Sequence, residues 1–297
     1  MILVKREAKG KVYSEPFSKG ILSRSLIRAD LDPSKAYEIA MKIESELIEN
    51  NIDSISSEDI VKRIIDLLGE ENSSVTENYL NWRKIRNTDE PLIILIGGAS
   101  GVGTSSISYE LSRRLGIKSM ISTDMIREVM RKIVSKDLSP VIHESSFSAQ
   151  KSFRVAPPPE FDHVLAGFKD HVGTVSVGVD AVIERALTEG ISIIIEGVHI
   201  VPGYIRKDLM EKENVLMFTL TLHDEDMHKD RFYSRCNDDW ASRPLQKYLD
   251  NFDSIRKTLI YMEDQAKREG VPIIDNIEKE KTIDIMIKSI AETYGGL

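Results

Sequence analysis

The chain has 297 residues, 30% of them charged and 41% apolar, and its formal net charge is −8. This length suits one or two domains, and the acidic balance argues against a dedicated nucleic-acid-binding protein, which would need a basic face. The single cysteine, Cys236, excludes a disulfide framework and suits a reducing compartment.

No stretch of the chain resembles a membrane or export signal. No apolar run reaches the ~18 residues that a membrane span requires, and residues 1–6 carry charges too early for a signal peptide. We therefore expect a cytoplasmic protein that contacts neither membrane nor nucleic acid. The many charged residues and few glutamines favour a heat-adapted source.

Residues 1–88 are predicted to form a small, mainly helical domain. It opens with an extended stretch, residues 2–6, which turns and returns at residues 12–13. Helical patterns follow, introduced by Asp32-Pro33, by a capping box at Ser56–Asp59 and by Val75.

Beyond a polar segment that ends at Pro91, strand and helix patterns alternate through a second domain, residues 89–297. This alternation predicts a parallel sheet of five strands covered by crossover helices. The predicted strands are Leu92–Ile96, Ser119–Ser122, Ile191–Ile195, Val215–Leu222 and Val271–Ile274. The predicted helices are Thr104–Leu115, Asp124–Ile133, Phe161–Glu189, Val201–Met210, Asp224–Cys236, Leu245–Arg268 and Lys281–Thr293. Glycines 116, 190 and 270 follow three of them and predict C-terminal stops.

The first of these strands leads into a segment that predicts a phosphate-binding loop. Such a P-loop reads G-x-x-x-x-G-K-[ST] between a strand and a helix, and here Gly98, Gly103 and Ser105 fill three of the fixed positions. The loop amides would hold the phosphates of ATP, and the Ser105 hydroxyl would bind Mg²⁺. Thr104 stands in the lysine position, so another cation must supply that charge. The predicted nucleotide-binding residues are Gly98, Ala99, Ser100, Gly101, Val102, Gly103, Thr104, Ser105 and Arg243.

Arginines after the fourth predicted strand are candidates for that cation. Arg231 and Arg235 are four residues apart and so share one face of a helix, and Arg243 follows them. P-loop kinases carry in this place a lid whose arginines close on the phosphates. We therefore predict that Arg231 and Arg235 are catalytic, the alternative being a solvated basic face.

Acidic residues follow two of the other strands. Asp124 comes after the second strand and Glu196 ends the third, and ligands of open α/β sheets bind at the carboxyl ends of the strands. Asp124 could take the proton of an acceptor hydroxyl, or it could cap the helix that follows. Ser105, Asp124 and Glu196 together form the predicted Mg²⁺ site.

Basic side chains near these acids predict an anionic acceptor. Arg127 and Arg131 lie about one helical turn apart, and two guanidinium groups suit a carboxylate or a phosphate, unless Glu128 pairs with one of them. His199, in the loop after the third strand, is a weaker candidate, because a lone histidine in a loop is more often structural. The predicted acceptor-binding residues are Arg127, Arg131, Glu196 and His199.

Three segments, Gly97–Ser105, Ser122–Arg127 and Glu196–Gly203, together resemble the 2-phosphoglycerate kinases, and the resemblance extends over about residues 91–297. It implies a P-loop kinase fold and ATP-dependent phosphorylation of the 3-hydroxyl of 2-phosphoglycerate. The product would be 2,3-bisphosphoglycerate, a precursor of cyclic 2,3-diphosphoglycerate. The resemblance also implies that threonine in the lysine position is a feature of the family.

The N-terminal domain resembles an ATP-cone domain through Leu3–Arg6 and Phe17–Ile21, followed by helices. This resemblance implies regulatory binding of adenine nucleotides. The chain departs from the pattern at Glu7-Ala8-Lys9, which lengthens the turn, so a purely structural domain stays an alternative.

Two other functions stay open at this point. The loop and the lid do not identify the acceptor, so a kinase for a nucleoside, a sugar or another hydroxy acid fits them equally. A non-catalytic ATP-sensing regulator is the second alternative, although a sensor has no need for carboxylates on the acceptor side. The sequence leaves open whether the chain forms a homo-oligomer.

Overall fold

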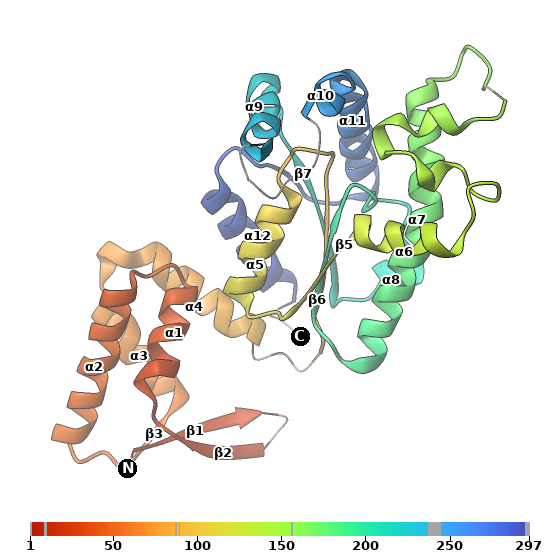
Figure 1. The fold of residues 1–297 in the computed structure, drawn as a ribbon. Coiled ribbons are helices and arrows are strands. Elements are labelled where there is room, and N and C mark those ends of the chain that lie inside the picture. The colour runs from red at the N-terminus through yellow and green to blue at the C-terminus, as the bar shows by residue number, and fades with distance from the viewer. Residues whose placement is uncertain are drawn as a thin grey trace. The chain divides into compact units, whose positions relative to one another are not determined.

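The computed structural model describes residues 2–8, 11–86, 88, 90–155, 157–236 and 245–294. The chain divides into two compact units (Figure 1). One contains residues 1–89 with 113–115 and 284–297, and the other contains 90–112 with 116–283.

The N-terminal unit combines a three-stranded sheet with four helices. Its strands are β1 (Leu3–Ala8), β2 (Lys11–Pro16) and β3 (Ser54–Ser56), in the order β2-β1-β3. Its helices are α1 (Lys19–Arg28), α2 (Pro33–Glu49), α3 (Ser57–Leu68) and α4 (Ser73–Arg86). The Asp32 carboxylate and the Ser56 hydroxyl accept bonds from the first turns of α2 and α3, which confirms both predicted starts. The parallel pairing of β3 with β1 was not predicted.

The second unit is built on a five-stranded, all-parallel sheet, as predicted. Its strands are β4 (Ile93–Gly97), β5 (Ser119–Ser122), β6 (Ile193–Gly197), β7 (Val215–Thr221) and β8 (Ile273–Asp275). The order β5-β6-β4-β7-β8 makes β4 the central strand. All five β4 residues are buried, because helices cover both faces of the sheet, and this double burial explains the continuous apolar run.

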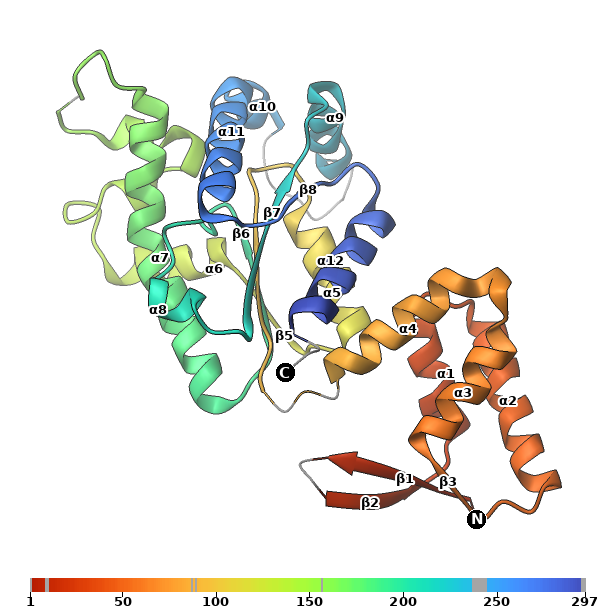
Figure 2. The same cartoon turned by 180° about the vertical axis from the view of Figure 1, so that it is seen from behind.

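Helices on both sides of the sheet connect these strands (Figures 1 and 2). They are α5 (Thr104–Leu115), α6 (Thr123–Ile133), α7 (His163–Glu189), α8 (Lys207–Met210), α9 (Glu225–Cys236), α10 (Leu245–Leu249) and α11 (Phe252–Glu269). A last helix, α12 (Lys279–Thr293), follows β8. In both views α5 lies on one side of the sheet, and α6, α7 and α8 lie on the other. Glycines 116, 190 and 270 end three helices with φ near +70°, which confirms the predicted stops.

Two predicted helices were wrong in extent. The predicted helix Val201–Met210 is helical from Lys207 only. Pro202 and Gly203 lie in a turn before it, and Gly203 has a φ of +84°, which does not fit a helix. The predicted helix Leu245–Arg268 is broken between α10 and α11. The Asn251 side chain donates to the Lys247 carbonyl (2.8 Å) and thereby takes up an acceptor at the end of α10.

The irregular segment between α6 and α7 contains two short 3₁₀ helices, Val141–His143 and Ser146–Ser152. The second packs closely on α7, where a Cβ atom on Gly167 would lie 2.3 Å from the Gln150 nitrogen. Throughout the described residues, helices fall short of the length or the apolar character that a membrane span demands.

Candidate active site

The loop between β4 and α5 borders a cavity at the carboxyl edge of the sheet. Gly101 and Gly103 have φ angles of +94° and +97°, a conformation that L side chains rarely adopt. A Cβ atom on Gly103 would lie 2.7 Å from Nδ2, the side-chain amide nitrogen of Asn276. Glycine therefore lets the chain turn tightly here, and the N-terminus of α5 begins at the cavity, where its N–H groups attract anions.

Side chains from distant segments hold this loop through its carbonyl groups. The Val102 carbonyl accepts bonds from Arg231 Nη1 (2.7 Å) and from Asn276 Nδ2 (2.8 Å). The Ser100 carbonyl lies 2.8 Å from Nε2 of His228, a fully buried residue of α9. Arg231 thus contacts the backbone of the loop, while His228 and Asn276 support it without having been singled out from the sequence.

The predicted metal ligands gather at the same cavity. The Ser105 hydroxyl donates to Oε1 of Glu196 (3.0 Å), and Glu196 is only 4% exposed. Asp124 lines the cavity from the first turn of α6. The helix cap is Ser122, whose hydroxyl accepts the Met125 N–H, so capping does not account for Asp124.

A second cavity, of about 440 Å³, adjoins the first and has the size of a small-molecule site. Ser100, Ser122, Asp124 and Val198 line both cavities. The Asp124 carboxylate consequently lies where the cavity bordered by the loop meets a larger cavity.

The structure separates the two arginines that were predicted to bind the acceptor. Arg127 lines the second cavity, where its Nε lies 3.5 Å from Asp124 Oδ1 and its Nη1 donates to the carbonyl of Glu144 (2.8 Å). Arg131 instead pairs with Glu128 (2.7 Å), as the alternative interpretation allowed, and it does not line the cavity.

His199 is fully buried and lines neither cavity. Its Nδ1 lies 2.7 Å from the Thr123 hydroxyl and its Nε2 lies 3.1 Å from Nδ1 of His171. Burial is the main cause that holds the pKa of His199 well below its ordinary value, with the neighbouring His171 and Arg127 adding to it. The structure therefore brings His199 to neither cavity. Its contact with Thr123 places it next to the start of the helix that carries Asp124.

The structure describes only the backbone of one of the two remaining predicted cations, Arg235 and Arg243. Arg235 lies on α9, one turn after Arg231, but its side chain is outside the described structure. Arg243 lies outside the described residues. Thr104, in the lysine position, lines the cavity bordered by the loop.

Several cavity-lining residues were not predicted from the sequence, because they belong to segments without a recognisable motif. Ser145, Ser146 and Phe147 belong to the segment between α6 and α7, and Lys247 and Tyr248 belong to α10. These two segments are about 100 residues apart in the chain, and they meet at the second cavity. Local sequence patterns do not reveal such a proximity.

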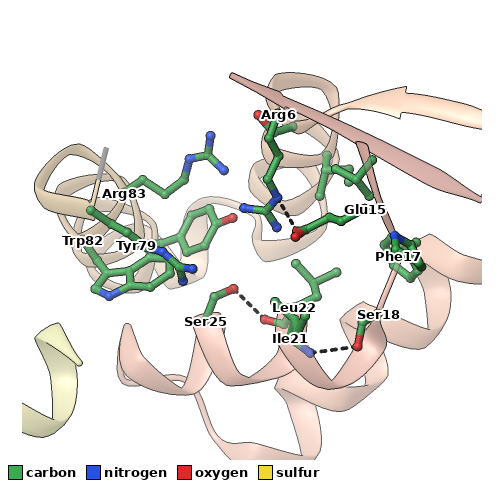
Figure 3. A pocket seen from close by; sticks show the side chains of 15 residues that line it. Arg6, Glu15, Phe17, Ser18, Ile21, Leu22, Ser25, Tyr79, Trp82 and Arg83 are labelled. Atoms are coloured by element: carbon green, nitrogen blue, oxygen red, sulfur yellow. Dashed lines mark hydrogen bonds and ion pairs between the residues drawn. The ribbon is translucent and has the colours of Figure 1, made fainter. Parts of the chain in front are cut away.

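The N-terminal unit has a cavity of its own, shown in Figure 3. Its lining includes three guanidinium groups, from Arg6, Arg83 and Arg86, together with the aromatic rings of Tyr79 and Trp82. Arg6 forms an ion pair with Glu15 (2.5 Å), and Arg86 lies over the Trp82 ring, 5.2 Å from its centroid. Cations beside aromatic rings suit an anionic ligand with a flat apolar part.

Known proteins match this chain in sequence over both of its units. Residues 7–88 match the ATP cone domain family. A 2-phosphoglycerate kinase of Methanothermobacter thermautotrophicus is 60% identical over 99% of this chain and 96% of its own length. A 2-phosphoglycerate kinase of Methanopyrus kandleri is 43% identical over 95% of this chain and 86% of its own length. The 2-phosphoglycerate kinase of Methanocaldococcus jannaschii is 45% identical over 96% and 90%.

A central parallel strand, a P-loop and acidic groups at the neighbouring strand ends define a P-loop kinase. The identities over nearly the whole chain extend this assignment. The chain belongs to the 2-phosphoglycerate kinase family, and it carries an N-terminal ATP-cone domain.

Proposed function

We propose that this protein transfers the γ-phosphoryl group of ATP to the 3-hydroxyl of 2-phosphoglycerate and forms 2,3-bisphosphoglycerate. The names of its relatives support the substrate. The observation that carries the mechanism is the position of Asp124, which lines both the phosphate cavity and the larger cavity beside it.

In this mechanism the loop amides and the N-terminus of α5 hold the phosphates. The acceptor occupies the second cavity with its hydroxyl at Asp124. The carboxylate accepts the hydroxyl proton as the oxygen attacks the γ-phosphorus. The bond from this phosphorus to the bridging oxygen of ADP breaks, and ADP leaves. The carboxylate also holds the nucleophile in line with that bond. Arg127, fixed by the Glu144 carbonyl, keeps the Asp124 side chain directed into the cavity.

The residues present fit a bound Mg²⁺ ion. Ser105 and Glu196 place a hydroxyl and a carboxylate 3.0 Å apart at the phosphate cavity, and Asp124 adds a second carboxylate. Hard oxygen donors of this kind are what Mg²⁺ prefers. When bound, the ion would neutralise phosphate charge, held by these three side chains directly or through water.

The cation that replaces the P-loop lysine is proposed to come from α9 and the segment after it. Arg231 already bonds to the Val102 carbonyl, so we assign it to holding the loop. Arg235 lies one turn further along α9 and, with Arg243, is the proposed partner of the transferred phosphoryl group.

The decisive experiment is to mix the purified protein with ATP, Mg²⁺ and 2-phosphoglycerate and to look for 2,3-bisphosphoglycerate. A panel with a nucleoside, a sugar and glycerate tests the other acceptors. Turnover of another acceptor in preference to 2-phosphoglycerate would refute the proposed substrate. ATP binding without turnover of any acceptor would favour the sensor.

We further propose that the cavity of the N-terminal unit binds an adenine nucleotide and regulates the kinase. The match to the ATP cone domain family and the cluster of arginines and aromatic rings support this proposal (Figure 3). The guanidinium groups would bind phosphates, and the rings would pack against the base.

A further inference from the structure

The second cavity is also lined by a lysine with no assigned role. Lys247 of α10 lines this cavity, and its Nζ donates to the Ser145 hydroxyl (2.7 Å) and lies 5.8 Å from the centroid of the Phe147 ring. Within the described part of the chain, no carboxylate lies within ion-pair distance of this ammonium group. A lysine directed at a hydroxyl in a cavity is suited to receive an anion.

We propose that Lys247, with the hydroxyls of Ser145 and Ser146, binds the 2-phosphate of the acceptor. The inference rests on the proposed function and specifies which part of the substrate this wall recognises. Lysine is a compact charge with three donors, and the two serines add a donor each, so together they match a dianion with three oxygens.

Among the described residues that line the cavity, the other cation is engaged elsewhere, which leaves Lys247 as the candidate for the phosphate. Arg127 faces Asp124 and two backbone carbonyls. The Glu128 carboxylate pairs with Arg131 and Lys132 and therefore does not offset the Lys247 charge.

A stack of rings fixes the position of Lys247 relative to the P-loop. Its neighbour Tyr248 stacks on Phe232, with centroids 4.8 Å apart and planes 14° apart. Phe232 stacks in turn on His228, whose Nε2 contacts the Ser100 carbonyl of the loop. These rigid rings connect α10, which carries the lysine, to the phosphate loop. An acceptor held by Lys247 therefore keeps a defined position relative to ATP.

The first test replaces Lys247 in the full-length enzyme by methionine, which retains most of the side-chain length and removes the charge. Loss of a charged hydrogen bond predicts a fall in kcat/KM for 2-phosphoglycerate of roughly 10- to 100-fold, with the KM for ATP unchanged. Lys247→Arg should recover part of the loss. Lys257→Met, at an exposed α11 lysine that pairs with Asp162, is the matched control.

The second test removes the phosphate from the substrate. Glycerate lacks the 2-phosphate, so Lys247→Met should leave its kcat/KM, or its inhibition constant against 2-phosphoglycerate, unchanged. An equal loss with both compounds would overturn the phosphate assignment in favour of the carboxylate. Wild-type kinetics in Lys247→Met would overturn the inference while the proposed function stands. A wild-type enzyme without turnover of 2-phosphoglycerate would refute the proposed function, and the inference with it.

Discussion

Asp124 is the residue on which the proposed chemistry depends most. Asp124→Asn retains the size of the side chain but removes the carboxylate that accepts the hydroxyl proton. We expect kcat to fall by roughly 10²- to 10⁴-fold, the contribution typical of a general base, while ATP binding changes little.

Steady-state rates and equilibrium binding of a non-hydrolysable ATP analogue would measure the two effects. The matched control is Asp226→Asn, because the Asp226 side chain is 97% exposed at the start of α9. An Asp124→Asn enzyme with wild-type kcat would remove this carboxylate from the mechanism.

The buried pair His171 and His199 predicts a dependence of stability on pH. Burial, with a contribution from Arg127, lowers the pKa of His171 from 6.5 to about 4. The unfolded chain therefore takes up a proton below pH 6.5 when the folded protein does not. The stability due to His171 is complete above pH 6.5 and is lost as the pH falls toward 4.

Urea unfolding at pH 7 and pH 5 tests this assignment. Over that interval His171 alone should account for a loss of about 2 kcal/mol in the free energy of unfolding. His171→Asn should be less stable at pH 7 but should show a smaller difference between the two pH values. If the free energy of unfolding changed equally between pH 7 and pH 5 in the variant and the wild type, the assignment to His171 would be contradicted.

At the scale of the element, the P-loop combines backbone strain with close packing. Gly103→Ala would force a Cβ atom to within 2.7 Å of Asn276 Nδ2 at a φ of +97°, so it should destabilise the protein by about 1–3 kcal/mol and weaken ATP binding. Gly173→Ala in α7 is the opposite case, because its Cβ would lie 3.9 Å from the nearest atom outside the helix backbone, on the Tyr204 ring.

That control should gain roughly 0.5–1 kcal/mol, since alanine is the better helix former. Thermal unfolding and ATP titration of both variants check the pair. A Gly103→Ala protein as stable as Gly173→Ala would show that the loop tolerates a side chain.

At the scale of the whole molecule, two units each contain a cavity suited to phosphates. If the N-terminal cavity binds nucleotide, the wild-type chain should bind two molecules of an ATP analogue, and Arg83→Met should bind one. The reason is that Arg83 contributes one of the three guanidinium groups of that cavity and is absent from the kinase site.

Isothermal titration would give the stoichiometry directly. Lys84→Met, at the exposed neighbouring position of α4, should still bind two. A stoichiometry of one for the wild type would contradict a nucleotide site in the N-terminal unit and favour a structural role for it.

Local patterns sufficed for the elements and for the loop. The run before Gly98, the cap at Asp32 and the glycines after three helices each act within a few residues, so they could be interpreted without the fold. The interruption at Asn251 and the late start of α8 were missed, because both depend on side-chain bonds and turns that compete with a helical pattern.

The sequence by itself determined the class of fold, the phosphate loop and the carboxylates at the strand ends, because parallel strands bring their carboxyl ends to one edge whatever the details. Only the tertiary structure decided which side chains reach the two cavities and which contact other residues instead. It buried His199, paired Arg131 with Glu128, placed Arg231 against the Val102 carbonyl and brought Lys247 to the cavity of Asp124. Such contacts join segments far apart in the chain, and packing of the whole unit selects them.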